Sequence, residues 1–450
     1  MPRRSVHLAG LMILILMALV CAASGCESAF DRHRVSLIRA HDRGDFAAAA
    51  RELDHANEEM LYGSKNEVLW LLERGAAAAA TGDSDLAVSA LNRAEAQTEL
   101  FYSQSATDIA GQWLIGERAT RYITRAYENQ YINVIKMLAH FQAGTIDNGP
   151  TVEARRMASK ADQMRDKFAD VLDEVRSRGV DDAYTLSNPG AFIESPLGVY
   201  LSAIAFRENG ESNMASTALK RLRSAAAAQA GLGISGDTSY VDELEERGAS
   251  EQDALFVAVG GVGPRLARQS VGPIYIYMTP IYFELPQIVP GGSRASRAIV
   301  EIEDPDGSTR TVELSLIEDL SAVAEANFQQ ELPVVHARTY VRALTKSGLF
   351  TAGGIAIRNS DDSPEAQAAG LLVSLIGGLV YLSATEKADV RCWSMLPGVA
   401  WAGVLDLPEG EHKARLVFLS PGGQRLHVGE WAPVRGGAHG LDSVIEYWPG

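Results

Sequence analysis

The sequence contains few cysteines, few aromatic residues and fewer basic than acidic residues. Three of the 450 residues are cysteine and 7% are aromatic, while Lys and Arg number 41 against 57 for Asp and Glu. Three cysteines cannot form a disulfide framework. The formal net charge of −16 argues against a general nucleic-acid binder, because affinity for phosphate depends on a basic surface. A chain that is 46% hydrophobic and 22% charged is typical of a globular protein and is not expected to be disordered.

The sequence also lacks the residue patterns of known catalytic and metal sites. Its nine histidines form neither H-x-x-x-H nor H-E-x-x-H, and His412 and His427 have the positions of strand-surface residues, so we expect no metal site. Segment 260–264 has the glycines of a phosphate loop but no G-K-[ST], and its final proline lacks an amide donor, so we expect a turn. Asp304 and Asp306 lie in the turn sequence Asp-Pro-Asp-Gly. We therefore expect no enzyme, no catalytic residue and no cofactor.

The strongest signal lies at the N-terminus. Arg3 and Arg4 precede an uncharged apolar run over 8–20, and small residues at 22–25 lead to Cys26. Basic, apolar and small-residue regions in that order make a secretory signal. The arrangement resembles a bacterial lipobox, in which diacylglycerol alkylates the cysteine thiol and the cysteine becomes the new N-terminus. We expect a signal peptide over residues 1–25 and lipid attachment at Cys26.

One residue of this lipobox is atypical, and the alternative is an ordinary signal peptide. Lipoboxes favour leucine three residues before the cysteine, where this chain has Ala23. Glu27 follows Cys26, and it does not suggest retention in the inner membrane as an aspartate would. We therefore expect a lipid-anchored protein of the bacterial cell envelope, on the outer membrane and facing the periplasm, because lipid chains can anchor a protein without a spanning helix.

Residues 26–250 are expected to form a helical domain built from repeats. From residue 35 to about 230 alanine and leucine are frequent and glycine marks the turns. A glycine followed by an acidic residue occurs at 44, 82 and 210, and small and apolar residues after each fall on one helix face. They are Ala49, Leu53 and Ala56, then Ala87, Leu91 and Ala94, then Ala215, Leu219 and Leu222.

Residues before these turns complete the repeat. Gly75 and Ala203 are the small residues expected where a preceding helix approaches its partner closely, and a less regular unit runs from Tyr127 to about Met157 around Gly144. These are features of tetratricopeptide-like helical pairs, which stack and expose a concave face. The alternative is a plain helical bundle without a groove.

Residues 251–450 are expected to form a β-rich domain. Five runs rich in β-branched and aromatic residues are separated by turns rich in Gly, Pro and Asp. The runs are 255–259, 274–278, 298–302, 311–314 and 414–419. Their spacing favours a β-sandwich. The expected fold class is therefore α+β multidomain, with N-terminal tetratricopeptide-like helical repeats followed by a β-sandwich-like domain with a helical insert.

The helical insert is an uncharged apolar stretch at 368–384. We expect an apolar helix over about 366–384. The stretch lies at the lower limit of length for crossing a bilayer. A buried helix is therefore favoured over one that contacts lipid or another subunit.

Two charged clusters invite a ligand-binding interpretation. The cluster at 153–156 could bind an anion, but an ion-paired helix face is commoner. Asp389, Arg391 and Trp393 alternate as on one face of a strand, which favours a buried Asp–Arg pair beside a core tryptophan. Cys392 is expected to be a buried free thiol.

Five segments carry a resemblance that spans most of the mature chain, with gaps. They are residues 70–75 (WLLERG), 127–131 (YENQY), 152–156 (VEARR), 263–265 (GPR) and 388–397 (ADVRCWSMLP), of which the last is the most specific. In these segments the chain resembles an uncharacterised family of bacterial lipoproteins that pair a tetratricopeptide-like N-terminal half with a C-terminal β domain. The resemblance implies an envelope location and a link to factors that assist cell-wall synthesis, and it implies no catalytic residues.

These features predict an envelope lipoprotein that acts as a non-enzymatic scaffold for protein–protein interaction. An envelope protein is the expected partner, and the lipid on Cys26 is the expected membrane contact. Cell-wall material is a second candidate for contact. One alternative is a peptidoglycan- or carbohydrate-binding module, which an exposed row of Trp393, Trp401, Trp431 and Trp448 would favour. Another is a hydrolase with an unrecognised site, which requires a deep pocket with two perturbed acids or a His–acid pair.

Overall fold

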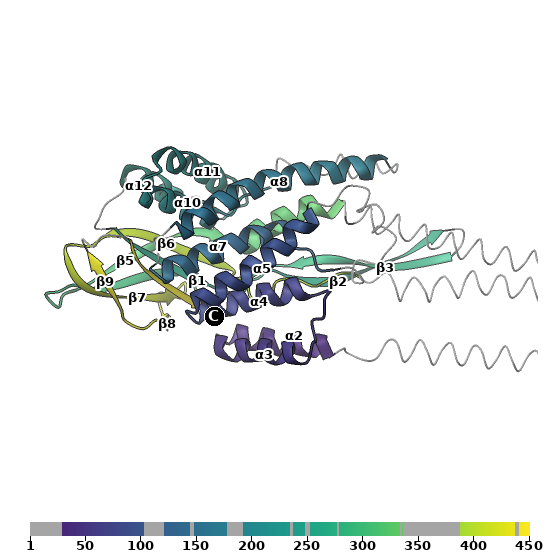
Figure 1. The fold of residues 1–450 in the computed structure, drawn as a ribbon, viewed down its shortest axis with the longest axis horizontal. Helices are drawn as coiled ribbons and strands as arrows, with labels where there is room; N and C mark the ends of the chain where they lie inside the picture. The colour runs from purple at the N-terminus through teal and green to yellow at the C-terminus, as the bar shows by residue number, and fades with distance from the viewer. Residues whose placement is uncertain are drawn as a thin grey trace, which may run out of the picture.

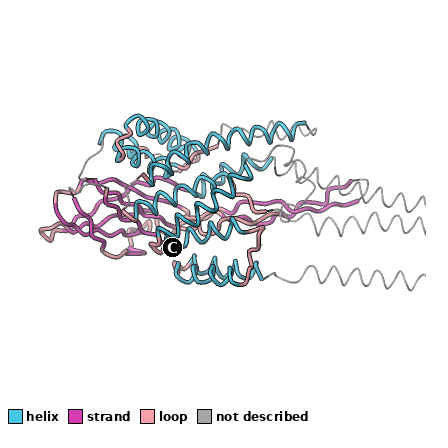
Figure 2. Tube along the Cα trace, viewed as in Figure 1, coloured by secondary structure: helices cyan, strands magenta, loops and turns pink. Residues whose placement is uncertain are grey.

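The computed structural model describes residues 29–102, 121–144, 148–177, 192–234, 237–247, 253–276, 279–333, 335, 388–436 and 441–450. Within these ranges helices fill the N-terminal half and a sheet lies in the C-terminal half (Figures 1 and 2), which confirms the expected mixed composition. The signal segment 1–25, Cys26 and the apolar stretch 368–384 lie outside the described residues.

The helices before the sheet pair into hairpins. They are α2 (Ala29–Asp42), α3 (Phe46–Glu58), α4 (Glu67–Ala80), α5 (Ser84–Tyr102), α7 (Ala126–Gln142), α8 (Gly149–Ser177), α10 (Pro196–Glu208), α11 (Ser212–Gly231) and α12 (Ser239–Arg247). The pairs are α2–α3, α4–α5, α7–α8 and α10–α11. Each pair is joined by a short turn, and these turns contain Gly44, Gly82, Gly144 and Gly210.

The glycines that follow the first helix of each hairpin share one backbone conformation. Their φ angles lie between 65° and 81°, a left-handed conformation in which a Cβ atom would be strained. The side chain of Asp45 accepts a hydrogen bond from the N–H of Ala48, and that of Asp83 accepts one from Leu86. Glycine therefore reverses the chain, and in the first two turns the following aspartate caps the next helix.

The hairpins stack in sequence order. α3 packs on α4, α5 on α7 and α8 on α10, and α7 also contacts α4 and α10. A Cβ atom on Gly75 would lie 2.5 Å from Cγ of Leu91, and one on Gly198 would lie 2.5 Å from Sδ of Met157. Both glycines are therefore needed for close helix contact. Gly75 has the role that the sequence predicts, whereas Gly198 was not singled out.

The C-terminal half contains one large sheet and a separate hairpin. The strands are β1 (Asp253–Gly260), β2 (Arg265–Ile276), β3 (Thr279–Val289), β4 (Arg297–Glu303), β5 (Thr309–Asp319), β6 (Val399–Asp406), β7 (Gly410–Leu419), β8 (Arg425–Val428), β9 (Ala432–Gly436) and β10 (Asp442–Trp448). The large sheet has the order β10-β1-β6-β5-β4-β7-β8, with β9 also paired to β7, and β1–β10 is a parallel pair. A helix follows β5 over residues 320–333.

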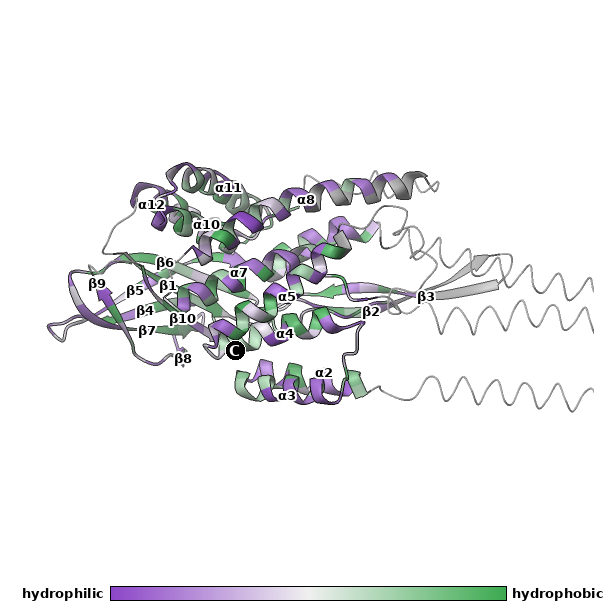
Figure 3. Cartoon of the chain, viewed as in Figure 1, coloured by the Kyte–Doolittle hydropathy of each residue, from purple (hydrophilic) through white to green (hydrophobic). Residues whose placement is uncertain are grey.

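The two faces of β1 belong to two cores. Leu255, Val257 and Val259 join the core that also contains the helices, whereas Phe256 and Ala258 join a second core between β1, β4, β7 and β10. α7 packs on β10 and α10 packs on β5, so the hairpins cover the first face. Figure 3 shows β1 and β6 as mostly hydrophobic strands beneath these helices. Burial on both faces explains the uninterrupted apolar run of β1.

β2 and β3 pair only with each other among the described strands. Leu266 and Ile288 bury the base of this hairpin in the helical core. From there the hairpin projects beyond the body of the molecule (Figures 1 and 2). The turn glycines at its base lie close to other backbone: a Cβ on Gly261 would be 2.5 Å from the carbonyl oxygen of Gly292, which supports a turn rather than a phosphate loop over 260–264.

Candidate functional site

Segment 388–397, the most specific part of the family resemblance, lies buried against α2, α4 and α7. Asp389, Val390 and Pro397 are half-buried and the other side chains of the segment are buried. The expectation that residues 389–393 form a strand is wrong, because this stretch is irregular. Its N–H groups bond side chains of the helices rather than a neighbouring strand.

Glu73 of α4 holds the centre of this segment. Its carboxylate is fully buried, and Oε1 accepts a hydrogen bond from Oγ of Ser394 at 2.6 Å. Oε2 accepts a hydrogen bond from the Tyr62 hydroxyl at 2.5 Å. The guanidinium of Arg34 lies 3.9 Å from Oε1 and donates at 2.9 Å to the carbonyl oxygen of Cys392. One buried acid thus joins α2, α4 and the segment.

Glu128 of α7 makes an equivalent set of contacts. Oε1 of this fully buried side chain accepts the N–H of Trp393 at 2.7 Å. Oε2 accepts the Tyr122 hydroxyl at 2.6 Å and the N–H of Arg125 at 2.7 Å. We call segment 388–397 together with Glu73 and Glu128 the clasp.

The predicted Asp–Arg pair is confirmed within the clasp. Nε of Arg391 donates to Oδ1 of Asp389 at 2.8 Å, and the second nitrogen lies 2.6 Å from Oδ2. The same guanidinium donates to Oδ1 of Asn66, the residue before α4, at 2.8 Å. Trp393 has no exposed surface and Cys392 is a buried free thiol, as the sequence predicts.

Burial governs the electrostatics of the clasp. It raises the pKa of Glu128, against the hydrogen bonds from Trp393, Tyr122 and Arg125. It also raises the pKa of the Tyr122 hydroxyl and of the Cys392 thiol. The side chains of Glu128, Tyr122 and Cys392 are buried away from solvent, so a substrate could reach them only after segment 388–397 detached from the helices. The role that this geometry supports for the clasp is to join the two halves of the chain.

The sheet and segment 388–397 together cover the inner side of the stacked hairpins. Every residue of α10 from Pro196 to Phe206 is buried, and so is every residue of α7 from Ala126 to Ala139. α3, by contrast, buries only Ala49, Leu53 and Ala56. The first helices of the hairpins therefore lie between the second helices and the chain's own sheet and segment.

Glu318 of β5 forms a second buried link between sheet and helices. Its Oε2 accepts hydrogen bonds from Oγ of Ser195 at 2.5 Å and from the N–H of Leu197 at 3.0 Å. Oγ of Ser195 also accepts the N–H of Gly198 and so caps α10. Burial raises the pKa of Glu318 to about 7, although hydrogen bonds from Ser195, Leu197 and Tyr131 oppose the change. The start of α10 is thus fixed to the sheet.

A third buried cluster joins α5, α7 and α8. Nζ of Lys136 lies 2.6 Å from Glu95 and 2.5 Å from Glu153. Lys160 also pairs with Glu95, and Arg156 pairs with both acids. Burial alone would raise the pKa of Glu95, but Lys160 and Lys136 lower it to about 2. The cluster at 153–156 is therefore ion-paired, the interpretation that the sequence favours.

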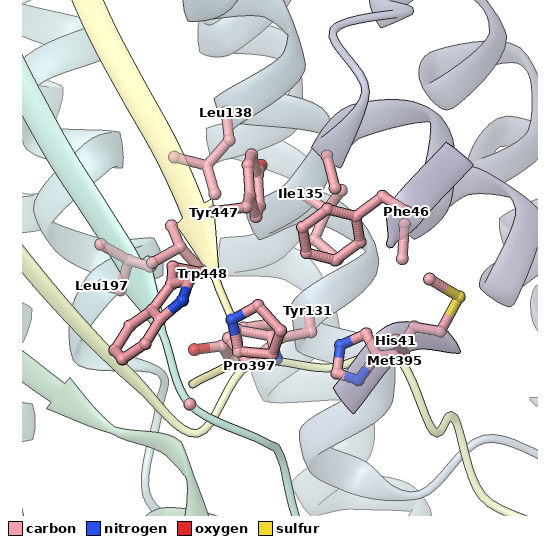
Figure 4. A pocket seen from close by; sticks show the side chains of 15 residues that line it. His41, Phe46, Tyr131, Ile135, Leu138, Leu197, Met395, Pro397, Tyr447 and Trp448 are labelled. Atoms are coloured by element: carbon pink, nitrogen blue, oxygen red, sulfur yellow. The ribbon is translucent and has the colours of Figure 1, made fainter. Parts of the chain in front are cut away.

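A small apolar cavity lies where the α2–α3 turn meets α7 and the end of β10. Figure 4 shows Phe46, Ile135, Tyr447 and Trp448 around it, with His41 at one side. The space open to the centre of a water molecule is about 20 Å³, enough for about one or two waters. This cavity is too small for a substrate of ordinary size.

Several His–acid pairs occur among the described residues, and His41, which lines this cavity, lies 3.1 Å from Asp42. The pairs of His412 and His427 lie away from the cavity. Nδ1 of His412 lies 2.9 Å from Asp304, and Nε2 lies 2.8 Å from the carbonyl oxygen of Pro408. His412 is buried, so its expected position on the strand surface is wrong. Nε2 of His427 lies 2.8 Å from Glu446. The His412 pair fixes the turn before β7, and we find no group of three potential metal ligands within the described ranges.

The four tryptophans do not form an exposed row. Trp393 and Trp401 are buried. Trp448 is half-buried and stacks on His427 with ring centroids 5.8 Å apart. Trp431 is half-buried beneath the guanidinium of Arg415. The sheet thus lacks the aligned aromatic surface that would favour a carbohydrate-binding module.

Sequence reasoning did not single out Glu73 and Glu128 as functional residues. Both lie in segments of the family resemblance, and Glu73 interrupts the apolar run Trp70–Leu72 of a helix that is otherwise rich in alanine. The sequence clue was an acidic residue within an apolar stretch of a helix, because an acid buried there needs hydrogen-bonding partners.

No helix among the described residues is long and apolar enough to cross a membrane. The stretch at 368–384 and Cys26, the expected lipid-attachment residue, fall outside the part of the chain on which that statement rests.

The chain matches no protein-family model, no curated protein and no solved structure.

Proposed function

We propose that this chain is a lipid-anchored protein of the bacterial envelope and a non-enzymatic scaffold for protein–protein contact. One observation carries the proposal: four stacked helical hairpins hold an extended segment of the same chain through buried carboxylates. Stacked hairpins bind extended segments on their inner side in repeat proteins generally. The buried acids of this chain are used to hold its own segment rather than to perform chemistry.

The hairpins fit tetratricopeptide-like repeats more closely than a plain bundle. Each hairpin contacts the next in sequence order, and α7 touches both α4 and α10, so the first helices of the last three hairpins are in contact. The left-handed glycine recurs in all four turns, and Gly75 stands at a close helix crossing. The curled sheet, whose β7 contacts β1 and β10, fits a β-sandwich-like second half.

A partner would bind the outer side of the hairpins, because the inner side is already covered. A shallow groove between α8 and α11 has Val199 and Phe206 of α10 at its floor. Met214 and Thr217 of α11 line it, and Met214 exposes 37% of its surface. Lipid on Cys26, three residues before α2, would hold this surface near a membrane, and the family resemblance suggests a link to cell-wall assembly.

In-cell photo-crosslinking tests the proposal. A photoreactive amino acid is placed at Met214 or Thr217 in the full-length chain, with and without Cys26→Ser. The matched control is Gln424, an exposed residue in the turn between β7 and β8. We expect discrete protein adducts from the groove positions, few from Gln424, and loss of most adducts in Cys26→Ser.

Two results would count against the scaffold. Identical adduct patterns at Met214 and Gln424 would mean that the groove is not a partner surface. Unchanged adducts and unchanged membrane association in Cys26→Ser would mean that no lipid on this residue holds the protein at the membrane.

A further inference from the structure

The β2–β3 hairpin is a long, self-paired element whose described strands make no other strand partner. Only its base is anchored: Leu266 and Ile288 are buried, and Arg265 pairs with Asp42 at the end of α2. The ladder continues outward to the pair Ile276–Thr279. A two-stranded hairpin is only marginally stable by itself in water, so one of this length that projects from the body suggests a contact outside the core.

The outer end of the hairpin lies beyond the first residue of α2. From Asp42 back to Ala29, α2 spans about 20 Å at 1.5 Å per residue. From Arg265 to Ile276, β2 spans about 36 Å at 3.3 Å per residue. Because Arg265 and Asp42 are paired and both elements run toward the same end of the molecule (Figure 1), the hairpin extends about 15 Å past Ala29.

Cys26 is tied to that same end. Cys26 lies three positions before Ala29, and three residues reach at most about 10 Å. A membrane that carries the lipid of Cys26 therefore lies within reach of the hairpin's outer strands. The hairpin is the described element that projects furthest in this direction (Figures 1 and 2).

The residue types change along the hairpin. The charged residues Arg265, Arg268 and Glu284 all lie in its base half, where Arg268 and Glu284 pair at 3.6 Å. Between Val271 and Phe283 the sequence has no charged residue and is rich in isoleucine and tyrosine. Apolar residues mixed with tyrosine suit the boundary between lipid headgroups and acyl chains.

We infer that the outer strands of the β2–β3 hairpin enter the surface of the lipid bilayer and form a second membrane contact beside the lipid on Cys26. The chain's net charge of −16 disfavours electrostatic attraction to anionic lipid, so the contact is apolar insertion into a neutral surface. The choice of a membrane rests on the proposed lipid anchor.

Vesicle flotation tests the hairpin apart from the anchor. The probe is the chain from residue 26 onward with Cys26→Ser, mixed with phosphatidylcholine vesicles. We expect the protein to float with the vesicles in 0.5 M salt as well as at low salt. Ile274→Asp with Ile276→Asp in β2 should lower the floating fraction at least tenfold.

Val289→Asp is the matched control. Val289 is a 45% exposed apolar residue at the base of the same hairpin, so the same substitution there should leave flotation unchanged. Thermal melting of both variants should match the parent, because the role inferred for residues 274 and 276 is contact with lipid and not packing in the body. Lower stability in the Ile274/Ile276 variant would assign that part of the hairpin to the core and overturn the inference.

The remaining outcomes separate this inference from the proposed function. Equal flotation of the Ile274/Ile276 variant and the Val289 variant, or flotation that salt abolishes, would overturn the hairpin contact while leaving the lipid anchor in place. Oligomers that form without vesicles and disappear in the Ile274/Ile276 variant would assign the hairpin to a second copy of the chain. Two further results could occur together: flotation that depends on the hairpin, and a Cys26 that carries no lipid in cells. They would support the inference and refute the proposed lipid anchor.

Discussion

The main-chain N–H of Trp393 donates a 2.7 Å hydrogen bond to the carboxylate of Glu128, which lies 265 residues earlier in the chain. Both groups are buried. Burying a carboxylate away from water costs free energy unless hydrogen-bond donors surround it. Here the helical half supplies the carboxylate of Glu128, and the later segment supplies the N–H of Trp393 as one of its donors. Neither half can bury these groups alone, so the stability of the two halves is coupled.

Glu128→Gln should therefore destabilise the whole protein. The amide offers one acceptor oxygen in place of two and turns an N–H group toward buried donors, which costs about 2 kcal/mol in the free energy of unfolding. Urea denaturation followed by circular dichroism measures the change. Glu313→Gln is the matched control, because Glu313 is exposed and pairs only with Arg297 at 3.4 Å; its effect should stay within about 0.5 kcal/mol. Equal effects would refute the coupling.

Glu318 should make stability depend on pH between about 4.5 and 7. Its pKa is raised to about 7 in the folded protein, so the folded state binds the proton more tightly than the unfolded state does. The contribution is fully present below about pH 4.5 and is lost as pH rises toward 7, by about 3 kcal/mol in total. Denaturation of wild type and Glu318→Gln at several pH values isolates the effect. Parallel curves for the two proteins would contradict the assignment.

Gly75→Ala should destabilise despite the better helix propensity of alanine. Its Cβ would lie 2.5 Å from Cγ of Leu91, and overpacking of this kind costs about 1–3 kcal/mol. Gly231→Ala at the end of α11 meets nothing within 4 Å, so it should be neutral or stabilise by up to about 1 kcal/mol. Thermal melting measures both. If the double variant Gly75→Ala/Leu91→Ala regains stability, the clash lies between these two side chains. A Gly75→Ala variant that is as stable as Gly231→Ala would contradict the prediction.

Cys392 should report on opening of the clasp. Its thiol is buried and burial raises its pKa, so in a chain from residue 26 with Cys26→Ser it should react with a thiol reagent only when segment 388–397 leaves. Glu128→Gln should speed the reaction about 30-fold if it costs about 2 kcal/mol. Absorbance of the released thiolate dye measures the rate, and Glu313→Gln should leave it unchanged. A fast reaction in the parent protein would mean that the clasp is open.

The sequence predicts the helical half well because its signals are local. A glycine in the left-handed region followed by aspartate acts within four residues, as Gly44 and Asp45 do. The strands β1, β4, β5 and β7 likewise carry β-branched runs. β3, β6, β8, β9 and β10 were not predicted. Of these, β8 and β9 have only four and five residues and depend on pairing with β7 for their conformation.

The clasp could not be predicted from one sequence, because its partners lie far apart along the chain. Glu73 and Ser394 are 321 residues apart, and no local periodicity links them. The alternation of Asp389, Arg391 and Trp393 suggested a strand, but hydrogen bonds from Trp393 and Ser394 to helix carboxylates replaced strand pairing. His412 was misplaced for the same reason, since a buried partner such as Asp304 leaves no mark in the nearby sequence.

The clasp also sets an order of events during biosynthesis. The helices that hold Glu73 and Glu128 emerge from the ribosome long before residue 394, and until then both carboxylates lack the donors that Trp393 and Ser394 supply. The N-terminal hairpins are therefore expected to stay incompletely packed through most of synthesis, as chains with distant contacts do. In the exported lipoprotein that we propose, the chain must stay unfolded until it has crossed the membrane. A fold whose late-made segment completes its first-made helices meets that requirement through its own connectivity.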